Sequence, residues 1–243
     1  MKIAAVSMFH DEEDVAEYVV RHMLDECDQV IIADNNSTDR SRIILEAIRN
    51  PHLTIVEEPR FAYGQPETMM RLVGMTNADW IIPFDFDEWW DAEGTIWEAL
   101  ESLDVEATGT TTWDMIPQDS DGTSRNPFKR IVHTRPGSLW SHPVHHKVAF
   151  RPASGRVLMP GNHGLEGRPL APTGPLRIRH YPFRSFEQAK AKLRHGRAVN
   201  LAAGVSGLGE HWSEWGDYSD DALMEWWSLW TMSEGLEVWQ SPS

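Results

Sequence analysis

The chain contains one cysteine, Cys27, among its 243 residues, so no disulfide can form within it. Long hydrophobic runs are also missing, since none approaches the ~20 residues that span a bilayer. The N-terminal stretch is too short and too quickly acidic for a secretory signal peptide. Together these absences favour a reducing compartment, and we expect a soluble, cytoplasmic protein without a membrane span.

Cations are scarce at both ends of the chain, and anions are scarce in the middle. Residues 1–124 carry 7 Lys or Arg against 27 Asp or Glu, and residues 210–243 carry none against 8. Residues 125–209 carry 15 Lys or Arg, and their only acidic residues are Glu166 and Glu187. This segregation indicates either that the middle segment binds an anionic partner or that it pairs with acidic parts of the fold.

Short apolar runs alternate with helical patterns along the first half of the chain. The runs that predict strands are Lys2–Met8, Gln29–Ala33, Leu53–Glu57, Trp80–Pro83 and Thr108–Ile116. The patterns that predict helices are Asp11–Leu24, Arg42–Ile48, Pro66–Met75 and Thr95–Leu103. This alternation predicts an α/β fold with a mixed, mostly parallel central sheet flanked by helices.

Carboxylates gather where the predicted strands end. Asp85, Asp87 and Glu88 follow the strand Trp80–Pro83, and their mutual repulsion makes folding costly unless a cation neutralises them. Their oxygens suit Mg²⁺ or Mn²⁺, and a metal held in this way can clamp a diphosphate. Asp34 and the segment from Phe9 to Glu12 end two other strands, and open α/β sheets bind their ligands at such ends.

The second half of the chain shows weaker alternation, with a basic helix predicted over Ser185–Arg197. A second, acidic helix is predicted from about Asp220, with Trp226, Trp227 and Trp230 on one face. We expect this Trp-rich helix to pack on the domain. A sugar platform or a partner surface is the alternative.

The order of these motifs resembles family-2-like glycosyltransferases of the GT-A fold. Three motifs end strands: Asp11-Glu12-Glu13, Asp34-Asn35-Asn36-Ser37-Thr38-Asp39 and Asp85-Phe86-Asp87-Glu88-Trp89. Two later stretches, His146–Pro152 and His180–Ser185, look like a subgroup of that family. The likeness covers about residues 1–197, and it departs from the family at Asp11, where Asn is usual.

The resemblance implies a nucleotide-sugar donor, a divalent cation (Mn²⁺ or Mg²⁺) and inversion at the anomeric carbon. By position, it assigns Phe9, Glu12 and Asp34 to the nucleoside, Arg71 to the diphosphate, Asp85 to the ribose and metal, and Asp87 to the metal. Because such folds often add a late histidine to the metal, His163 and His180 are further candidate ligands.

The implied organisation is a GT-A-like domain over residues 1–200, followed by a helical extension over residues 201–243. Within the domain, residues 1–124 form a nucleotide-sugar half and residues 125–200 an acceptor half.

Inversion also needs a base that deprotonates the acceptor hydroxyl. The candidates, in order, are Asp114, Glu166 and His180.

The basic helix suggests which acceptor is bound. Lys190, Arg194 and Arg197 fall on one face of this helix, which suits a polyanion such as hydroxymethylated DNA. A phosphorylated glycan or a lipid-linked acceptor suits the same charge, and a neutral glycan is the alternative if these cations pair within the fold.

Two other classes compete with a glycosyltransferase. A sugar nucleotidyltransferase needs a Gly-rich loop and a lysine after the first strand, and the stretch from Ser7 to Glu12 has neither. A non-catalytic module that only binds nucleotide sugars remains open, because the base is not fixed by the sequence.

Overall fold

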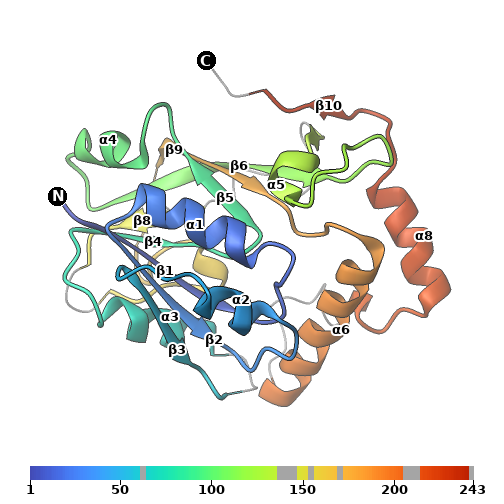
Figure 1. The fold of residues 1–243 in the computed structure, drawn as a ribbon, viewed down its shortest axis with the longest axis horizontal. Coiled ribbons are helices and arrows are strands. Elements are labelled where there is room, and N and C mark those ends of the chain that lie inside the picture. Colours follow the sequence, from blue (N-terminus) through green and yellow to red (C-terminus); the bar gives the residue numbers. More distant parts are fainter. Residues whose placement is uncertain (61–63, 136–146, 153–155, 169–171, 205–213, 241–243) are drawn as a thin grey trace.

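The computed structural model describes residues 1–60, 64–135, 147–152, 156–168, 172–204 and 214–240 (Figure 1). In the first half the elements are β1 (Ile3–Phe9), α1 (Ala16–Glu26), β2 (Gln29–Asp34), α2 (Ser41–Glu46), β3 (Leu53–Glu57), α3 (Gln65–Val73), β4 (Trp80–Pro83), β5 (Glu88–Asp91), α4 (Ile96–Glu101) and β6 (Ala107–Ile116). The second half adds α5 (Pro127–Arg130), β7 (His133–Thr134), β8 (Val148–Phe150), the 3₁₀ turn η1 (Pro160–Asn162), β9 (Thr173–His180), α6 (Phe186–Ala203), α8 (Asp220–Trp230) and β10 (Glu237–Val238).

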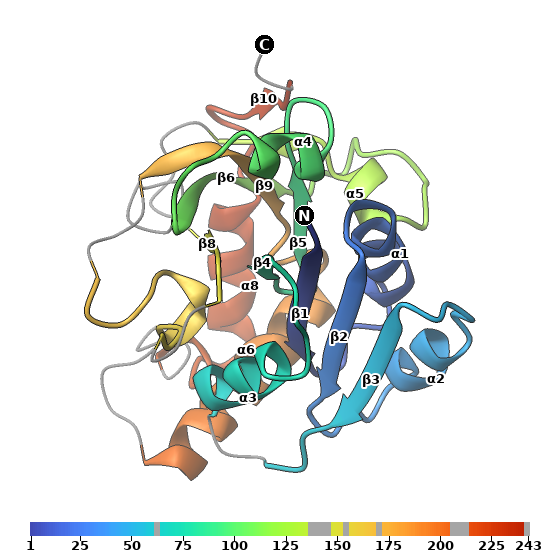
Figure 2. The same cartoon turned by 90° about the vertical axis from the view of Figure 1, so that its left-hand side faces the viewer.

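One mixed sheet runs through the molecule in the order β10-β7-β6-β8-β4-β1-β2-β3, and β9 pairs with both β5 and β6. The strands β4, β1, β2 and β3 are mutually parallel, as the alternation of strands and helices predicted. Helices α1 and α2 lie on one side of this parallel part and α3 lies on the other (Figure 2). The predicted α/β fold is therefore confirmed.

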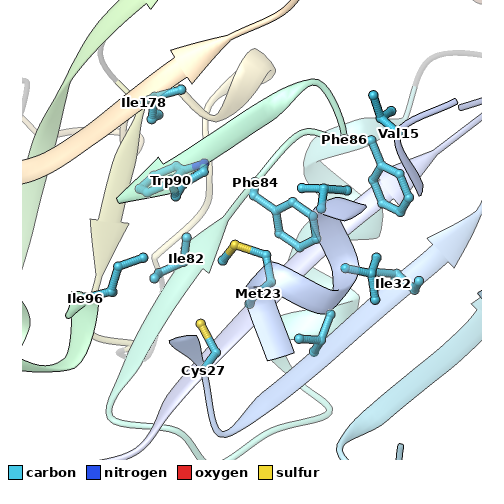
Figure 3. Close-up of a cluster of buried hydrophobic side chains, with 14 of the residues drawn as sticks. Val15, Met23, Cys27, Ile32, Ile82, Phe84, Phe86, Trp90, Ile96 and Ile178 are labelled. Carbon is cyan, nitrogen blue, oxygen red and sulfur yellow. The ribbon is translucent and has the colours of Figure 1, made fainter. Parts of the chain in front are cut away.

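Alternate residues of β1 point into two separate cores, because successive side chains in a strand point to opposite faces. Ile3 and Ala5 pack with α1, whereas Ala4 and Val6 pack with α3. The larger core holds Val15, Met23, Cys27, Phe84 and Trp90, among others (Figure 3). Each large apolar side chain buried in this way stabilises the fold by about 1.5–3 kcal/mol. This core therefore fixes the strands whose ends carry the polar motifs.

Helix α1 begins later than the sequence pattern predicted, at Ala16 rather than Asp11. Asp11 adopts a positive φ of 51°, and its carboxylate accepts hydrogen bonds from the backbone N–H groups of Thr38 and Asp39. The acidic stretch after β1 therefore forms a loop bound to the β2–α2 loop instead of a first helical turn.

The C-terminal segment packs on the domain, as expected. Helices α6 and α8 lie next to each other (Figure 1), and their side chains share a small core with Ile116 and Phe183. Strand β10 then pairs with β7 at the edge of the sheet. No helix in the described ranges is long and apolar enough to cross a membrane.

Candidate active site

A cavity of about 470 Å³ opens where β1, β4 and β9 end. Most of the residues predicted for the site line it: Phe9, Glu12, Asp85, Asp87, Asp114, His163 and His180. Asp34, Arg71 and Glu166 are not among its lining residues. The cavity therefore joins the acidic motif after β4 to residues from the second half of the chain.

Asp85 is bound by the ammonium group of Lys147, which was not among the predicted site residues. Lys147 Nζ lies 2.5 Å from Asp85 Oδ2 and 3.0 Å from Glu88 Oε1. Glu88 is fully buried and also accepts hydrogen bonds from the Asp85 N–H (3.0 Å) and Trp90 Nε1 (3.1 Å). Burial raises the pKa of Glu88 and disfavours the Lys147 ammonium, but the two carboxylates more than offset this and raise the pKa of Lys147.

Asp87 belongs to a row of charged groups along the cavity wall, in which Lys192, Asp87, His180 and Asp114 are linked one to the next. Its Oδ2 is bonded to Lys192 Nζ and lies 3.5 Å from His180 Nε2. The other ring nitrogen of His180, Nδ1, lies 2.8 Å from Asp114 Oδ1. Burial opposes the charge on Asp87, but Lys192 and His180 hold the pKa of Asp87 well below its usual range.

The pairing register of β9 brings His180 next to both Glu88 and Asp114. His180 pairs with Glu88 of β5 on one side and with Asp114 of β6 on the other. Despite burial, the two flanking carboxylates raise the pKa of His180 to about 10. These two carboxylates, those of Asp87 and Asp114, orient the imidazole, which would have to lose the proton on Nε2, the nitrogen that faces Asp87, before it could bind a metal.

Glu12 is also paired with a buried cation that we did not assign to the site from sequence. Arg184 Nη2 donates to Glu12 Oε2 at 2.5 Å, and Arg184 Nε donates to Asp14 Oδ2 at 2.8 Å. Burial raises the pKa of Glu12, and Arg184 opposes this shift. The His180–Ser185 motif contains Arg184, which was a signal of its importance, although the partner could not be inferred.

The remaining predicted residues lie elsewhere. Asp34 lines a second, more open hollow with Asn36 and Arg42, and it accepts a hydrogen bond from the Ser37 N–H at 2.9 Å. Arg71 Nη2 lies 3.1 Å from Glu58 Oε2, so its guanidinium is engaged by a carboxylate.

Glu166 is exposed on a turn outside the cavity lining. Glu166 therefore lies apart from Asp114 and His180, the other two candidate bases, which both line the cavity.

The basic helix does not present the cationic face that the sequence suggested. Lys190 Nζ lies 2.5 Å from Asp220 Oδ2, Arg194 Nη2 lies 3.3 Å from Asp220 Oδ1, and Arg197 Nη2 lies 2.5 Å from Asp217 Oδ1. Arg194 also donates to two carbonyl groups of the same C-terminal segment. Of the two readings of the charge segregation, these contacts favour pairing within the fold.

A divalent cation fits the residues around Asp87, although no group of three His, Cys, Asp or Glu within the described part of the chain is arranged to hold one. A Mg²⁺ ion that binds a substrate diphosphate usually takes only one or two carboxylates from the protein. The Lys192 ammonium already marks a cation position at Asp87. His180, oriented by Asp114, has the carboxylate–histidine arrangement that commonly supports a metal ligand.

Comparison with known proteins identifies the class. Residues 5–155, more than half of the chain, match the model of glycosyl transferase family 2. The chain belongs to this family. The expectation drawn from the order of motifs is thus confirmed. No curated protein matches the chain.

Solved structures with a similar fold have low sequence identity to this chain. S. aureus TarS 1–349 is 13% identical, with 96% of this chain and 73% of that chain covered and a TM-score of 0.46. In its complex with UDP, 62% of this chain and 47% of that chain are covered, at 13% identity and a TM-score of 0.41. Glucosyl-3-phosphoglycerate synthase from Mycobacterium tuberculosis, in complex with Mn²⁺, UDP and glucosyl-3-phosphoglycerate, is 15% identical, with 86% and 82% covered and a TM-score of 0.44.

Proposed function

We propose that this protein transfers a sugar from a nucleoside-diphosphate sugar to an acceptor hydroxyl, with a divalent cation and with inversion at the anomeric carbon. In this reaction the bond from the anomeric carbon to the diphosphate oxygen breaks, and a bond to the acceptor oxygen forms. The acceptor proton passes to a base, and the nucleoside diphosphate leaves. The observation that carries the proposal is the contact of His180 with both Asp87 and Asp114 at the wall of the cavity.

Asp87 and His180 would hold Mn²⁺ or Mg²⁺ at this wall, with Asp85 beside the metal and the ribose. When bound, the metal neutralises the negative charge that develops on the leaving diphosphate. Lys147 and Lys192 line the same cavity and place two further cations near that charge. Charged groups fixed in this way stabilise the transition state without reorganising during the reaction.

The nucleoside would bind at the ends of β1 and β2, reaching from Phe9 and Glu12 in the cavity to Asp34, the register partner of Phe9, in the second hollow. A nucleoside diphosphate bound at about 100 times its Kd should stabilise the fold by ~2.7 kcal/mol and raise Tm by several degrees. We expect this shift for at least one nucleoside diphosphate with Mn²⁺. Asp34→Ala should reduce it, whereas the exposed Asp104→Ala should not. The measurement is a thermal-shift screen, and no shift with any nucleoside diphosphate would contradict the proposed donor.

A module that binds nucleotide sugars without chemistry would give the same thermal shift. Incubation with the stabilising nucleotide sugar and Mn²⁺ separates the two functions. A transferase should slowly release the nucleoside diphosphate to water, whereas a binding module should release none.

The role of Asp114 can be decided by measuring how the activity of an Asp114→Asn variant depends on metal concentration. As the base, Asp114 would contribute roughly 10²–10⁴-fold to kcat, and Asp114→Asn should lower kcat by that factor at any metal concentration. As a residue that only orients His180, it would affect metal affinity by about 10–100-fold, and excess Mn²⁺ should restore kcat. We expect the first result, because Asp114 lines the cavity. Recovery at high Mn²⁺ would reduce Asp114 to a positioning residue.

For the acceptor, the sequence left nucleic acid and glycan open. The three cations that favoured a polyanion are paired with Asp217 and Asp220. This pairing supports a glycan acceptor over hydroxymethylated DNA.

A further inference from the structure

Two tryptophans from the C-terminal segment line the cavity that contains Asp87 and His180. They are Trp215 and Trp230, and Phe183, Thr112 and Asn200 line it with them. Trp215 and Trp230 lie beyond residue 155, where the match to the family model ends. The segment that packs on the domain therefore also contributes to the wall of the candidate active site.

These rings are held firmly by other aromatic groups. The ring of Phe183 meets Trp226 and Trp230 edge-on, with centroid distances of 5.0 and 5.4 Å. Trp226 also packs against Trp215 at 5.3 Å. Beside them, Asp220 at the start of α8 is paired with Lys190 and Arg194 of α6. A ligand would thus meet a preorganised aromatic surface, which lowers the entropic cost of binding.

The chemistry of this part of the wall suits a neutral ring that carries hydroxyl groups. Indole faces pack against apolar C–H surfaces, and Trp230 Nε1 and Thr112 Oγ1 are buried polar atoms without a hydrogen-bond partner in the described part of the chain. The ammonium groups of Lys147 and Lys192, which also line the cavity, are bonded to carboxylates. In the proposed function these two cations also face the donor diphosphate, so an anionic acceptor would have to compete with that diphosphate for them, whereas a neutral acceptor would not.

We propose that Trp215 and Trp230 form the acceptor subsite and stack a sugar ring there, so that the acceptor is a neutral saccharide. This inference rests on the proposed function, since it places the acceptor beside the donor end of the same cavity. It also gives the C-terminal segment a direct part in substrate recognition.

The test measures saccharide binding directly. Saturation-transfer NMR with cellobiose, lactose and N,N′-diacetylchitobiose, in the presence of a nucleoside diphosphate and Mn²⁺, should detect binding of at least one of them. Trp215→Leu and Trp230→Leu should each weaken that binding by about tenfold or more, equivalent to ~1.4 kcal/mol. Trp227→Leu is the matched control, because Trp227 packs in the same aromatic core but does not line the cavity. It should bind the saccharide as the wild type does.

The outcomes separate this inference from the proposed function. Trp215 is only partly buried, so its variant should keep its fold even if Trp230→Leu does not. Absence of saccharide binding by the wild type, or unchanged binding in Trp215→Leu, would overturn the inference. A nucleoside diphosphate thermal shift that persists in that case would leave the proposed donor standing. Saccharide binding without any such shift would support the subsite and contradict the donor.

Discussion

Replacing Asp87 with Asn is expected to lower kcat/KM for sugar transfer by roughly a thousandfold, or ~4 kcal/mol of transition-state stabilisation. Asparagine keeps the shape of the side chain but removes the charge to which Lys192 and His180 are bound. The substitution therefore weakens the cation position at the diphosphate without creating a cavity. Initial rates with nucleotide sugar and acceptor, measured at saturating Mn²⁺, provide the test.

The matched control is Asp91→Asn. Asp91 is the last residue of β5, four positions after Asp87, and lies 3.6 Å from Arg179 of β9, but it does not line the cavity. Transfer by this variant should stay within about twofold of the wild type, because Asp91 is not among the residues that line the cavity. Wild-type activity should vanish in EDTA and return with Mn²⁺ or Mg²⁺. Full activity in the chelator, or in Asp87→Asn, would contradict the metal assignment.

The part of the site that the sequence predicted comes from strand ends. Phe9 ends β1 and Asp85 follows β4, and these strands are parallel neighbours in the sheet. Parallel strands bring their carboxyl ends to one edge, so alternation of strands and helices was enough to group them. The same reasoning placed Asp34 beside Phe9, its register partner in β2, although the structure puts Asp34 in a separate hollow.

The cations of the site could not be predicted in the same way. Lys192 and Arg184 are far from their partners in sequence, and a count of charges shows only that cations and anions are segregated. Which pairs form depends on how α6 and β9 lie against the parallel strands. The register that sets His180 between Glu88 and Asp114 is likewise a tertiary property, because strand pairing over such separations has no local signal.

Lys147 provides the second large expected effect, and it concerns stability. Lys147→Met should lower the free energy of unfolding by about 3–5 kcal/mol, the usual cost of removing one partner of a buried ion pair. Its ammonium bonds to both Asp85 and Glu88, and Glu88 is only 1% exposed. Methionine fills a similar volume, so the loss would come from the charge left on Glu88 without its cation. Urea unfolding followed by tryptophan fluorescence measures the change.

Two further variants show whether the loss of stability comes from the buried charge left on Glu88 or from the removal of any lysine. Lys190→Met removes a lysine whose partner, Asp220, has a side chain that is 63% exposed, and it should cost at most ~1 kcal/mol. The double variant Lys147→Met with Glu88→Gln should recover much of the stability lost in Lys147→Met, since the uncompensated charge is gone. If Lys147→Met were no more destabilising than Lys190→Met, the Lys147–Glu88 contact would not hold the acidic motif in place. The carboxylates after β4 would then depend on a bound cation for their folded arrangement.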